Sequence, residues 1–307
     1  MMRGSPLLAL LVLTCTDPSP QADAYVTGPC EPPTPWADLP AEVEETSGVA
    51  ASRVHLGVFW THNDSGGDAA IFALDSTGTI LARVRVREAT NRDWEDIAAA
   101  PCEPGAPAQC LYLADTGDNL EQRESVVVFR IPEPDPFSDT VTTPADRLEM
   151  SYPDGPSDAE ALYITDAGLH LVTKGRSRSI GLYRLSLPYD PRNTVLTRVQ
   201  QLAPPPTSIS AQVTGAAASP DGRVVVLRTY SGLRFFEPDA DSLRPLGETA
   251  DFLSPAQPLG EGVDFIGPGR LVLTGEAGGR RPATIAAVRC DLRPRTTAPS
   301  AGGDSTP

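Results

Sequence analysis

The chain has 307 residues, of which 40% are hydrophobic, and it contains 32 prolines and 26 glycines. Its formal net charge is −15 at pH 7 and it has no run of Lys or Arg, which argues against binding nucleic acid or an anionic membrane through a basic surface. The many turn-forming residues and the apolar fraction indicate one large all-β domain with a sizeable core.

Residues 1–15 have the pattern of a signal peptide. A single positive charge precedes an apolar run, Leu7 to Leu13, and Cys15 follows. The run is apolar on all sides, unlike the amphipathic helix of a soluble core. It resembles the signal of a bacterial lipoprotein with Cys15 as the lipidated residue; simple cleavage nearby is the alternative.

The segments beside the predicted domain are polar. Residues 16–23 are predicted to be a flexible tether and residues 293–307 a disordered tail, because both have few apolar residues. No later stretch approaches the run of about 20 apolar residues that a membrane helix needs. We therefore expect export to the cell envelope, periplasmic or at the outer surface, with membrane contact only through the N-terminal lipid.

Four further cysteines form an even set, as in proteins of oxidising compartments, and four allow three pairings. Cys102 and Cys110 flank a turn-rich segment that a local disulfide would close. Cys30 and Cys290 lie near the two ends of the predicted domain, where a bond would join the termini. No pair has C-x-x-C spacing, which argues against a zinc site.

Residues 24–292 contain five units with the same order of strands. Short apolar runs alternate with turns, and no stretch longer than about ten residues keeps helical periodicity. The five first strands begin near Thr46, Trp94, Ala159, Val213 and Gly260. Two apolar strands follow in each unit, and a weaker fourth in four of them. Four strands per unit, repeated about every 45 to 65 residues, predict an all-β propeller with five four-stranded blades.

The fifth unit lacks a fourth strand after Cys290. We expect the segment from Ala24 to Cys30 to pair with the last blade, which would close the ring and remove an open edge. A Cys30–Cys290 bond would then lock this closure. Six blades are the alternative if the N-terminal segment contains more than one strand.

The starts of the first strands are predicted to converge on the central channel. We call these five positions the first ring: Ser47, Glu95, Glu160, Thr214 and Glu261. Three carboxylates that lie together raise one another's pKa unless a cation sits among them. An all-oxygen set suits a hard cation, and calcium tolerates irregular geometry better than magnesium. The alternative is that these side chains bind strand ends or water without a metal.

The ends of the second strands are predicted to form a second ring at the same face. Its members are Asn63 with Asp64, Asp115, Lys174, Arg228 and Glu276. Mixed charges at the mouth of a channel suit recognition of a small anionic ligand, because acids position a cation and water while Lys and Arg hold an anionic group. The alternative is that these are solvated loop charges.

The order Ser, Glu, Glu, Thr, Glu, together with N-D-S-G at residues 63–66, resembles the five-bladed calcium-dependent apyrases. In that family a ring of Glu and Ser holds a central calcium, which implies the same role for the first ring here. The family's Asp-Asp-Arg-Thr-Gly run is replaced by N-D-S-G, which lacks the Arg and argues against nucleotide hydrolysis. The motifs S-G-V-A, D-W-E-D-I-A, D-T-G-D-N and R-T-Y also resemble exported bacterial propellers of unassigned activity, related in architecture to phytase-like propellers.

Two functions of different class follow. In the first, which we favour because no residue marks a nucleophile, the chain is a calcium-binding module or scaffold tethered to the envelope, a monomer that binds a small anionic ligand or a protein. The alternative is a calcium-dependent phosphohydrolase. There Asp64 or Asp115 would act as base while Lys174 and Arg228 stabilise the transition state.

Overall fold

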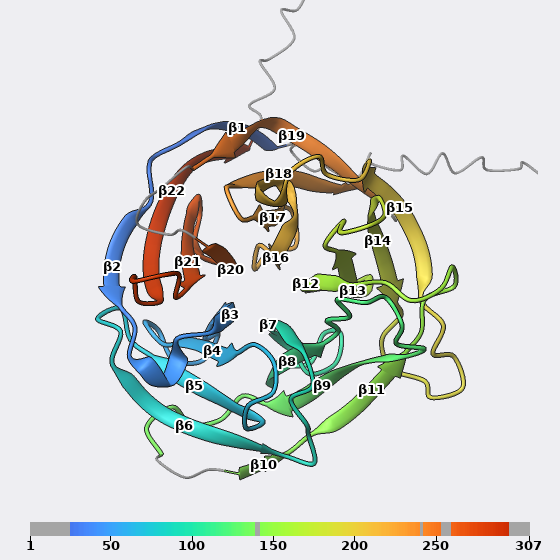
Figure 1. The fold of residues 1–307 in the computed structure, drawn as a ribbon, viewed down its shortest axis with the longest axis horizontal. Coiled ribbons are helices and arrows are strands. Elements are labelled where there is room, and N and C mark those ends of the chain that lie inside the picture. The colour runs from blue at the N-terminus through green and yellow to red at the C-terminus, as the bar shows by residue number, and fades with distance from the viewer. Residues whose placement is uncertain (1–24, 139–141, 240–241, 253–258, 295–307) are drawn as a thin grey trace, which may run out of the picture.

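The computed structural model describes residues 25–138, 142–239, 242–252 and 259–294. These residues form five sheets arranged around a central axis (Figure 1), so the predicted five-bladed β-propeller is confirmed. The described part of the chain contains two short 3-10 helices and no α-helix, and therefore no helix able to cross a membrane. The predicted signal peptide, Cys15, the tether and residues 295–307 of the tail lie outside the described residues.

Blades 1 to 4 each take four strands in chain order from the axis outward. Blade 1 contains β3 (Thr46–Ala51), β4 (Phe59–Asn63), β5 (Ala70–Leu74) and β6 (Ile80–Arg87). Blade 2 contains β7 (Trp94–Pro101), β8 (Gln109–Asp115), β9 (Val126–Pro132) and β11 (Asp146–Met150). Blade 3 contains β12 (Ala159–Thr165), β13 (Gly168–Thr173), β14 (Ile180–Leu185) and β15 (Thr197–Ala203). Blade 4 contains β16 (Val213–Ala218), β17 (Val225–Thr229), β18 (Gly232–Asp239) and β19 (Ser242–Asp251).

Blade 5 closes the ring with strands from both ends of the domain. Its inner strands are β20 (Leu259–Gly267), β21 (Arg270–Glu276) and β22 (Thr284–Pro294). The outer edge of β22 pairs with β1 (Tyr25–Cys30) along its C-terminal half and with β2 (Thr34–Asp38) along its N-terminal half. The predicted N-terminal closure is confirmed, but two strands supply it. In addition, β10 (Thr142–Pro144) pairs with the outer edge of β6 in blade 1.

Both predicted disulfides are present. Cys30 and Cys290 join β1 to β22 across 260 positions of sequence, and Cys102 and Cys110 close the β7–β8 connection. β22 continues to Pro294, past the predicted domain end at residue 292, because its last residues pair with β1.

The hydrophobic core is divided into wedges between neighbouring blades. Five clusters of buried apolar side chains fill the five contacts between blades of the described chain. Between blades 1 and 2, for example, Trp60 and Trp94 are fully buried. Strand side chains alternate between the two faces of a blade, so each blade contributes to two wedges. The axis is thereby left to the first strands.

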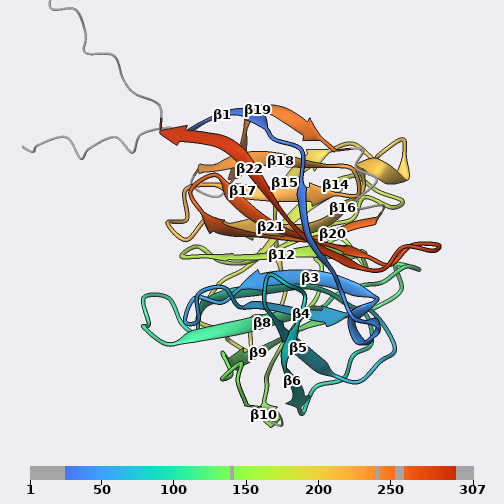
Figure 2. The same cartoon turned by 90° about the vertical axis from the view of Figure 1, so that its left-hand side faces the viewer.

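The propeller has two faces, which we name by the direction of the first strands. The mouth face is where the first strands begin, and the exit face is where they end. β22 starts beside Gly275 at the mouth face, passes Arg270 at the β20–β21 turn and ends at Pro294, opposite Tyr25. The chain therefore enters β1 and leaves β22 on the exit face, as Figure 2 shows.

Candidate functional site

Each first strand carries a β-bulge at its mouth end. In blade 2, Trp94 pairs with Asp115 and Asp96 pairs with Ala114, which leaves Glu95 as the extra residue. The other four bulges contain the equivalent residues, Ser47 with Gly48, Glu160, Thr214, and Glu261 with Gly262. A bulge turns a side chain out of the regular alternation, often beside a functional site. The first ring predicted from the sequence thus occupies one structural position in all five blades, and all five side chains are buried.

The two hydroxyls of the first ring connect neighbouring blades. Ser47 Oγ donates to the Glu95 carbonyl oxygen at 2.6 Å, and Thr214 Oγ1 donates to the Gly260 carbonyl oxygen at 2.8 Å. Thr116 Oγ1 makes the corresponding bond from blade 2 to the Ala159 carbonyl oxygen of blade 3 at 2.7 Å. These hydroxyls act in blade-to-blade contact, and the carboxylates remain as the ionic part of the ring.

Glu95 and Glu160 lie close together at the mouth of the channel, with carboxylate oxygens within 4.8 Å of one another. Burial raises the pKa of both groups, and the Glu160 charge raises the pKa of Glu95 further. Lys174 Nζ donates to Glu160 Oε1 and opposes this rise. One Lys against two buried carboxylates leaves a negative charge that a retained proton or a further cation must balance.

Further acids surround this pair and form two groups that share Glu95. In the first group, carboxylate oxygens of Asp64, Asp93 and Glu95 lie within 4.8 Å of one another. In the second, those of Glu95, Asp158 and Glu160 do the same. We call Asp64, Asp93 and Glu95 the acidic triad.

Only the second group has cations within ion-pair distance among the described residues, although the Lys174 charge also lowers the pKa of Asp64, Asp93 and Glu95. Arg176 Nε lies 3.0 Å from Asp158 Oδ2, and Lys174 bonds Glu160. The ion pairs of the described residues include none with the acidic triad. Burial, together with the charges of Asp93, Glu160 and Glu276, raises the pKa of Asp64 to about 7.

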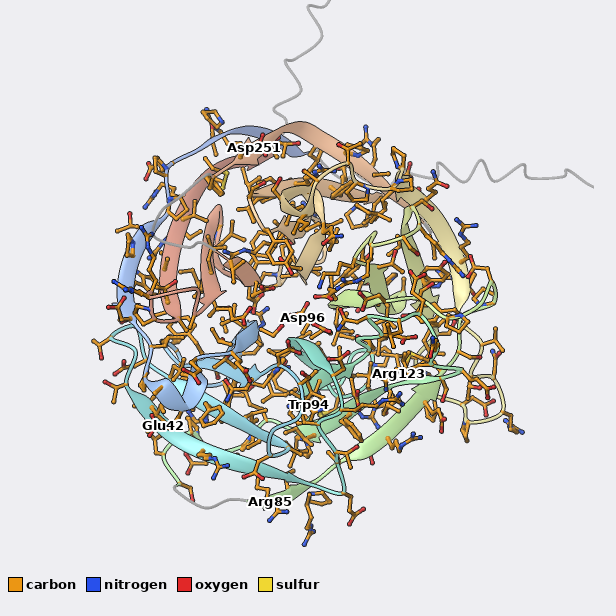
Figure 3. The ribbon with its side chains drawn as sticks, viewed as in Figure 1. Glu42, Arg85, Trp94, Asp96, Arg123 and Asp251 are labelled. Carbon is orange, nitrogen blue, oxygen red and sulfur yellow. A yellow bond between two sulfur atoms is a disulfide. The ribbon has the colours of Figure 1, made fainter. Side chains whose placement is uncertain are left out.

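Asp96 lies one position deeper than Glu95 and has a different environment. Its Oδ1 accepts the Ile97 N–H at 2.9 Å, and its Oδ2 accepts the N–H groups of Leu162 at 2.9 Å and Ala216 at 3.1 Å. Three blades therefore donate to one side chain, which Figure 3 shows near the centre of the ring. Burial raises the pKa of Asp96 and the three donors oppose this rise.

The other blades place small residues at the level of Asp96: Gly48, Ala161, Gly215 and Gly262. A Cβ on Gly48 would come within 2.5 Å of the Ile97 nitrogen, so the first strands approach too closely for a side chain there. Two positions further along its strand, Asp264 makes a similar link from blade 5 to blade 1, where its Oδ2 accepts the Ala51 N–H at 2.8 Å. This level of the channel is structural.

The second ring departs from the predicted register at two residues. The strand pairing aligns five residues, each directly after the partner of the residue that precedes the bulge: Asp64, Thr116, Lys174, Tyr230 and Glu276. Asp115 and Arg228 fall before these positions because the strand ends are offset between blades.

Asp115 and Arg228 are occupied by structural contacts. Asp115 Oδ1 accepts from Arg123 Nη1 at 3.0 Å and from the Asp93 N–H at 3.2 Å. Arg228 is buried and Nη1 donates to the Gly262 carbonyl oxygen, and burial lowers its pKa to about 10. In blade 4 the position expected for Arg228 is taken by Tyr230. Lys174 Nζ lies 5.7 Å from the centre of the Tyr230 ring. Catalytic roles for Asp115 and Arg228 stay predictions.

The sequence did contain a signal for the acids that the first ring omits. Asp93 and Asp158 each stand two positions before a ring glutamate, in D-W-E and D-A-E. Blade 1 has the related E-T-S, with an exposed Glu45. The acid two positions before each ring glutamate lies at the same mouth face. The repeated D-x-E spacing therefore predicts that these acids join the carboxylate cluster.

The chain matches no protein-family model and no curated protein. Solved structures share its fold. A PQQ-bound aldose sugar dehydrogenase from Streptomyces coelicolor is similar over 85% of this chain and 98% of that chain, with a TM-score of 0.52 and 13% identity. A gluconolactonase from Xanthomonas campestris gives a TM-score of 0.45 at 13% identity over 90% and 99% of the two chains. A TolB-related protein from Agrobacterium tumefaciens gives 0.41 at 12% over 85% of each chain.

These similarities concern the fold alone. The fold and the site define a five-bladed β-propeller with a cluster of buried carboxylates at one end of its channel. The carboxylates could hold a metal ion, and the two disulfides suit an extracytoplasmic compartment.

Proposed function

We propose that this protein is an exported, lipid-anchored β-propeller that binds a calcium ion at its mouth and uses this site to bind a small anionic ligand or a partner protein. The acidic triad carries the proposal. Its three carboxylates lie within 4.8 Å of one another, and no Lys or Arg of the described chain is paired with them. A cation would remove the repulsion that this arrangement creates.

The donor set favours calcium. All the donors are carboxylate oxygens, which suit a hard cation. They come from the β4–β5 connection (Asp64), the β6–β7 connection (Asp93) and β7 (Glu95), and calcium tolerates the irregular geometry that such a set gives. Asp64 Oδ1 is buried and has no hydrogen-bond partner, so it fits the role of a ligand atom. Asp64, Asp93 and Glu95 would hold the ion, and Glu160 lies beside them. A bound calcium supplies positive charge to attract anionic groups.

Export and anchoring rest on the N-terminal sequence and on the disulfides. The charge, apolar run and Cys15 of residues 1–15 follow a lipoprotein signal. The disulfides Cys30–Cys290 and Cys102–Cys110 need an oxidising compartment to persist. Mass spectrometry of the mature chain tests the anchor, because lipidation adds acyl mass at Cys15.

Thermal unfolding of the full chain in EDTA and in millimolar calcium tests the metal site. A ligand at 100 times its Kd stabilises the folded state by about 2.7 kcal/mol, so Tm should rise clearly. Asp93→Asn should abolish the rise in Tm that calcium causes. Asp166→Asn is the matched control, because Asp166 is exposed in the β12–β13 turn. An equal calcium shift in wild type and Asp93→Asn removes the triad as the site.

A second candidate is a calcium-dependent phosphohydrolase. Asp64, whose pKa is raised to about 7, and the Lys174 ammonium face the same mouth. Asp64 would take a proton from water, while Lys174 would hold an anionic oxygen of the substrate. Phosphate release from p-nitrophenyl phosphate and from nucleoside triphosphates tests this function. It should be lost in Asp64→Asn while folding persists; no release by the wild type excludes these substrates and favours the binding module.

A further inference from the structure

The exit face displays apolar side chains at one place. The described residues expose six large hydrophobic side chains, and three of them belong to a single cluster. Val54 is 57% exposed and Leu56 is 98% exposed in the β3–β4 connection, and Phe137 is 66% exposed after β9. The Phe137 ring meets the His55 ring edge-on at 5.8 Å. We call Val54, Leu56 and Phe137 the apolar tip.

The connection that carries the apolar tip is held in a fixed shape. Ser52 Oγ accepts the N–H groups of Val54 at 3.2 Å and His55 at 2.7 Å, and the Val58 N–H donates to the His55 carbonyl oxygen at 3.2 Å. Arg53 Nη2 pairs with the buried Asp264 at 3.0 Å. These bonds hold Val54 and Leu56 in exposed positions outside the core. Exposure of their apolar surface to water is unfavourable in free energy.

The start of the described chain places the N-terminal tether on the same face. β1 begins at Tyr25, opposite Pro294, and Figure 2 shows this end of β22 on the side to which β3 runs. Nine positions, residues 16–24, separate Cys15 from Tyr25. At about 3.3–3.6 Å per residue, the ten steps from Cys15 to Tyr25 span roughly 35 Å at most. A lipid on Cys15 would therefore hold the exit face close to a bilayer.

The mouth face gathers acidic side chains, although it also exposes Leu120 and Ile209. It carries the acidic triad with Glu160, Glu261 and Glu276, whose negative charge is repelled by anionic lipid headgroups. The acidic cluster thus favours an orientation in which the mouth points away from an anionic bilayer.

We propose that the exit face is a membrane-docking surface, with the apolar tip inserted at the boundary between headgroups and acyl chains and the mouth directed away from the bilayer. The proposal rests on the lipid anchor of the proposed function. The anchor and the tip together supply two membrane contacts, and two contacts hold a protein more firmly than a single lipid chain. They also fix its orientation, which a flexible tether alone cannot do.

Tryptophan fluorescence in vesicles tests this orientation. The lipidated full chain, as wild type, Leu56→Trp or Leu120→Trp, is reconstituted into vesicles of phosphatidylethanolamine and phosphatidylglycerol whose acyl chains carry bromine. Leu120 is the matched control, because it is 75% exposed in the β8–β9 connection at the mouth face. After subtraction of the wild-type signal, the emission added by Leu56→Trp should be lost to bromine quenching, and that added by Leu120→Trp should be retained.

Three other results would overturn the proposal, each in a distinguishable way. If the chain sediments with vesicles but Leu56→Trp is unquenched, the anchor stands and the tip is not a membrane contact; a protein partner then becomes its occupant. Equal quenching of both variants excludes a fixed orientation. If the wild type stays in the supernatant, the lipid anchor fails, and the docking proposal fails with it. The calcium-dependent Tm of each variant, unchanged from wild type, confirms that the fold is intact.

Discussion

Glu95 and Asp96 are adjacent in the sequence and both are buried, yet they belong to two different regions of the channel. Asp96 accepts three backbone N–H groups from blades 2, 3 and 4, so hydrogen bonds offset the cost of its burial. Glu95 faces the carboxylates of Asp64, Asp93 and Glu160. The comparison teaches that a buried acid with a full set of donors is structural, whereas one that faces other acids marks a site.

The difference arises from the local backbone. At the level of Asp96, Gly48, Gly215 and Gly262 let the first strands approach closely enough for one carboxylate to reach three blades. One residue earlier, the bulge in each blade turns the side chain toward the mouth. The same strands thus form a tightly packed level around Asp96 and, one residue nearer the mouth, a level where carboxylates lie together.

The largest expected effect comes from removing the structural acid. Asp96→Ala should lower the free energy of unfolding by about 3–5 kcal/mol, because it leaves three buried N–H groups without an acceptor. Urea denaturation measures the loss. Asp166→Ala, at an exposed turn, should change stability little. A small loss for Asp96→Ala would show that water replaces the carboxylate and would weaken the distinction between the two levels.

The close approach of the first strands can be tested separately. Gly48→Ala should cost about 1–3 kcal/mol, since its Cβ would lie 2.5 Å from the Ile97 nitrogen and the strands must move apart. Gly67→Ala is the control, because a Cβ there meets no atom within 4 Å. Thermal and urea unfolding of both variants give the comparison, and equal stabilities would contradict the packing argument.

The mouth acids predict a particular pH dependence in EDTA. Burial raises the folded-state pKa of Glu95 and Glu160, and that of Asp64 from 3.8 to about 7. Such groups contribute stability below their unfolded pKa values, near pH 4, and lose it as pH rises through the folded values. The mouth contribution to stability should therefore fall between about pH 4 and pH 7.

Calcium should flatten this fall, because the ion stabilises the ionised carboxylates. Unfolding curves from pH 4 to pH 8, with EDTA and with calcium, measure the two slopes. The double variant Asp64→Asn with Glu95→Gln should lose most of the slope in EDTA and all of the calcium effect. A wild-type slope unchanged by calcium would contradict a metal at the triad.

The smallest effect is expected at the ring hydroxyls. Ser47→Ala removes one hydrogen bond between blades 1 and 2 and should cost about 1 kcal/mol. Thr214→Val should behave similarly between blades 4 and 5. Both variants should keep the calcium shift in Tm, which separates the hydroxyls from the carboxylates. Loss of the calcium-dependent Tm shift in Ser47→Ala would instead indicate that Ser47 takes part in binding the metal.

The sequence by itself determined the repeat and the positions that face the channel. Strand periodicity and turn residues are local properties, so five blades, the N-terminal closure and the five first-strand positions of the first ring could be predicted. The disulfide pairs followed from where Cys30 and Cys290 lie relative to the ring ends.

Only the tertiary structure decided what each acid does. The donors to Asp96 come from Leu162 and Ala216, in two other blades, and no local pattern reveals such contacts. The Arg123 partner of Asp115 and the offset that puts Tyr230 in the place expected for Arg228 depend on strand register, which pairing between strands sets. Burial, partners and register are properties of the assembled ring, and they separate the structural carboxylates from the acidic triad.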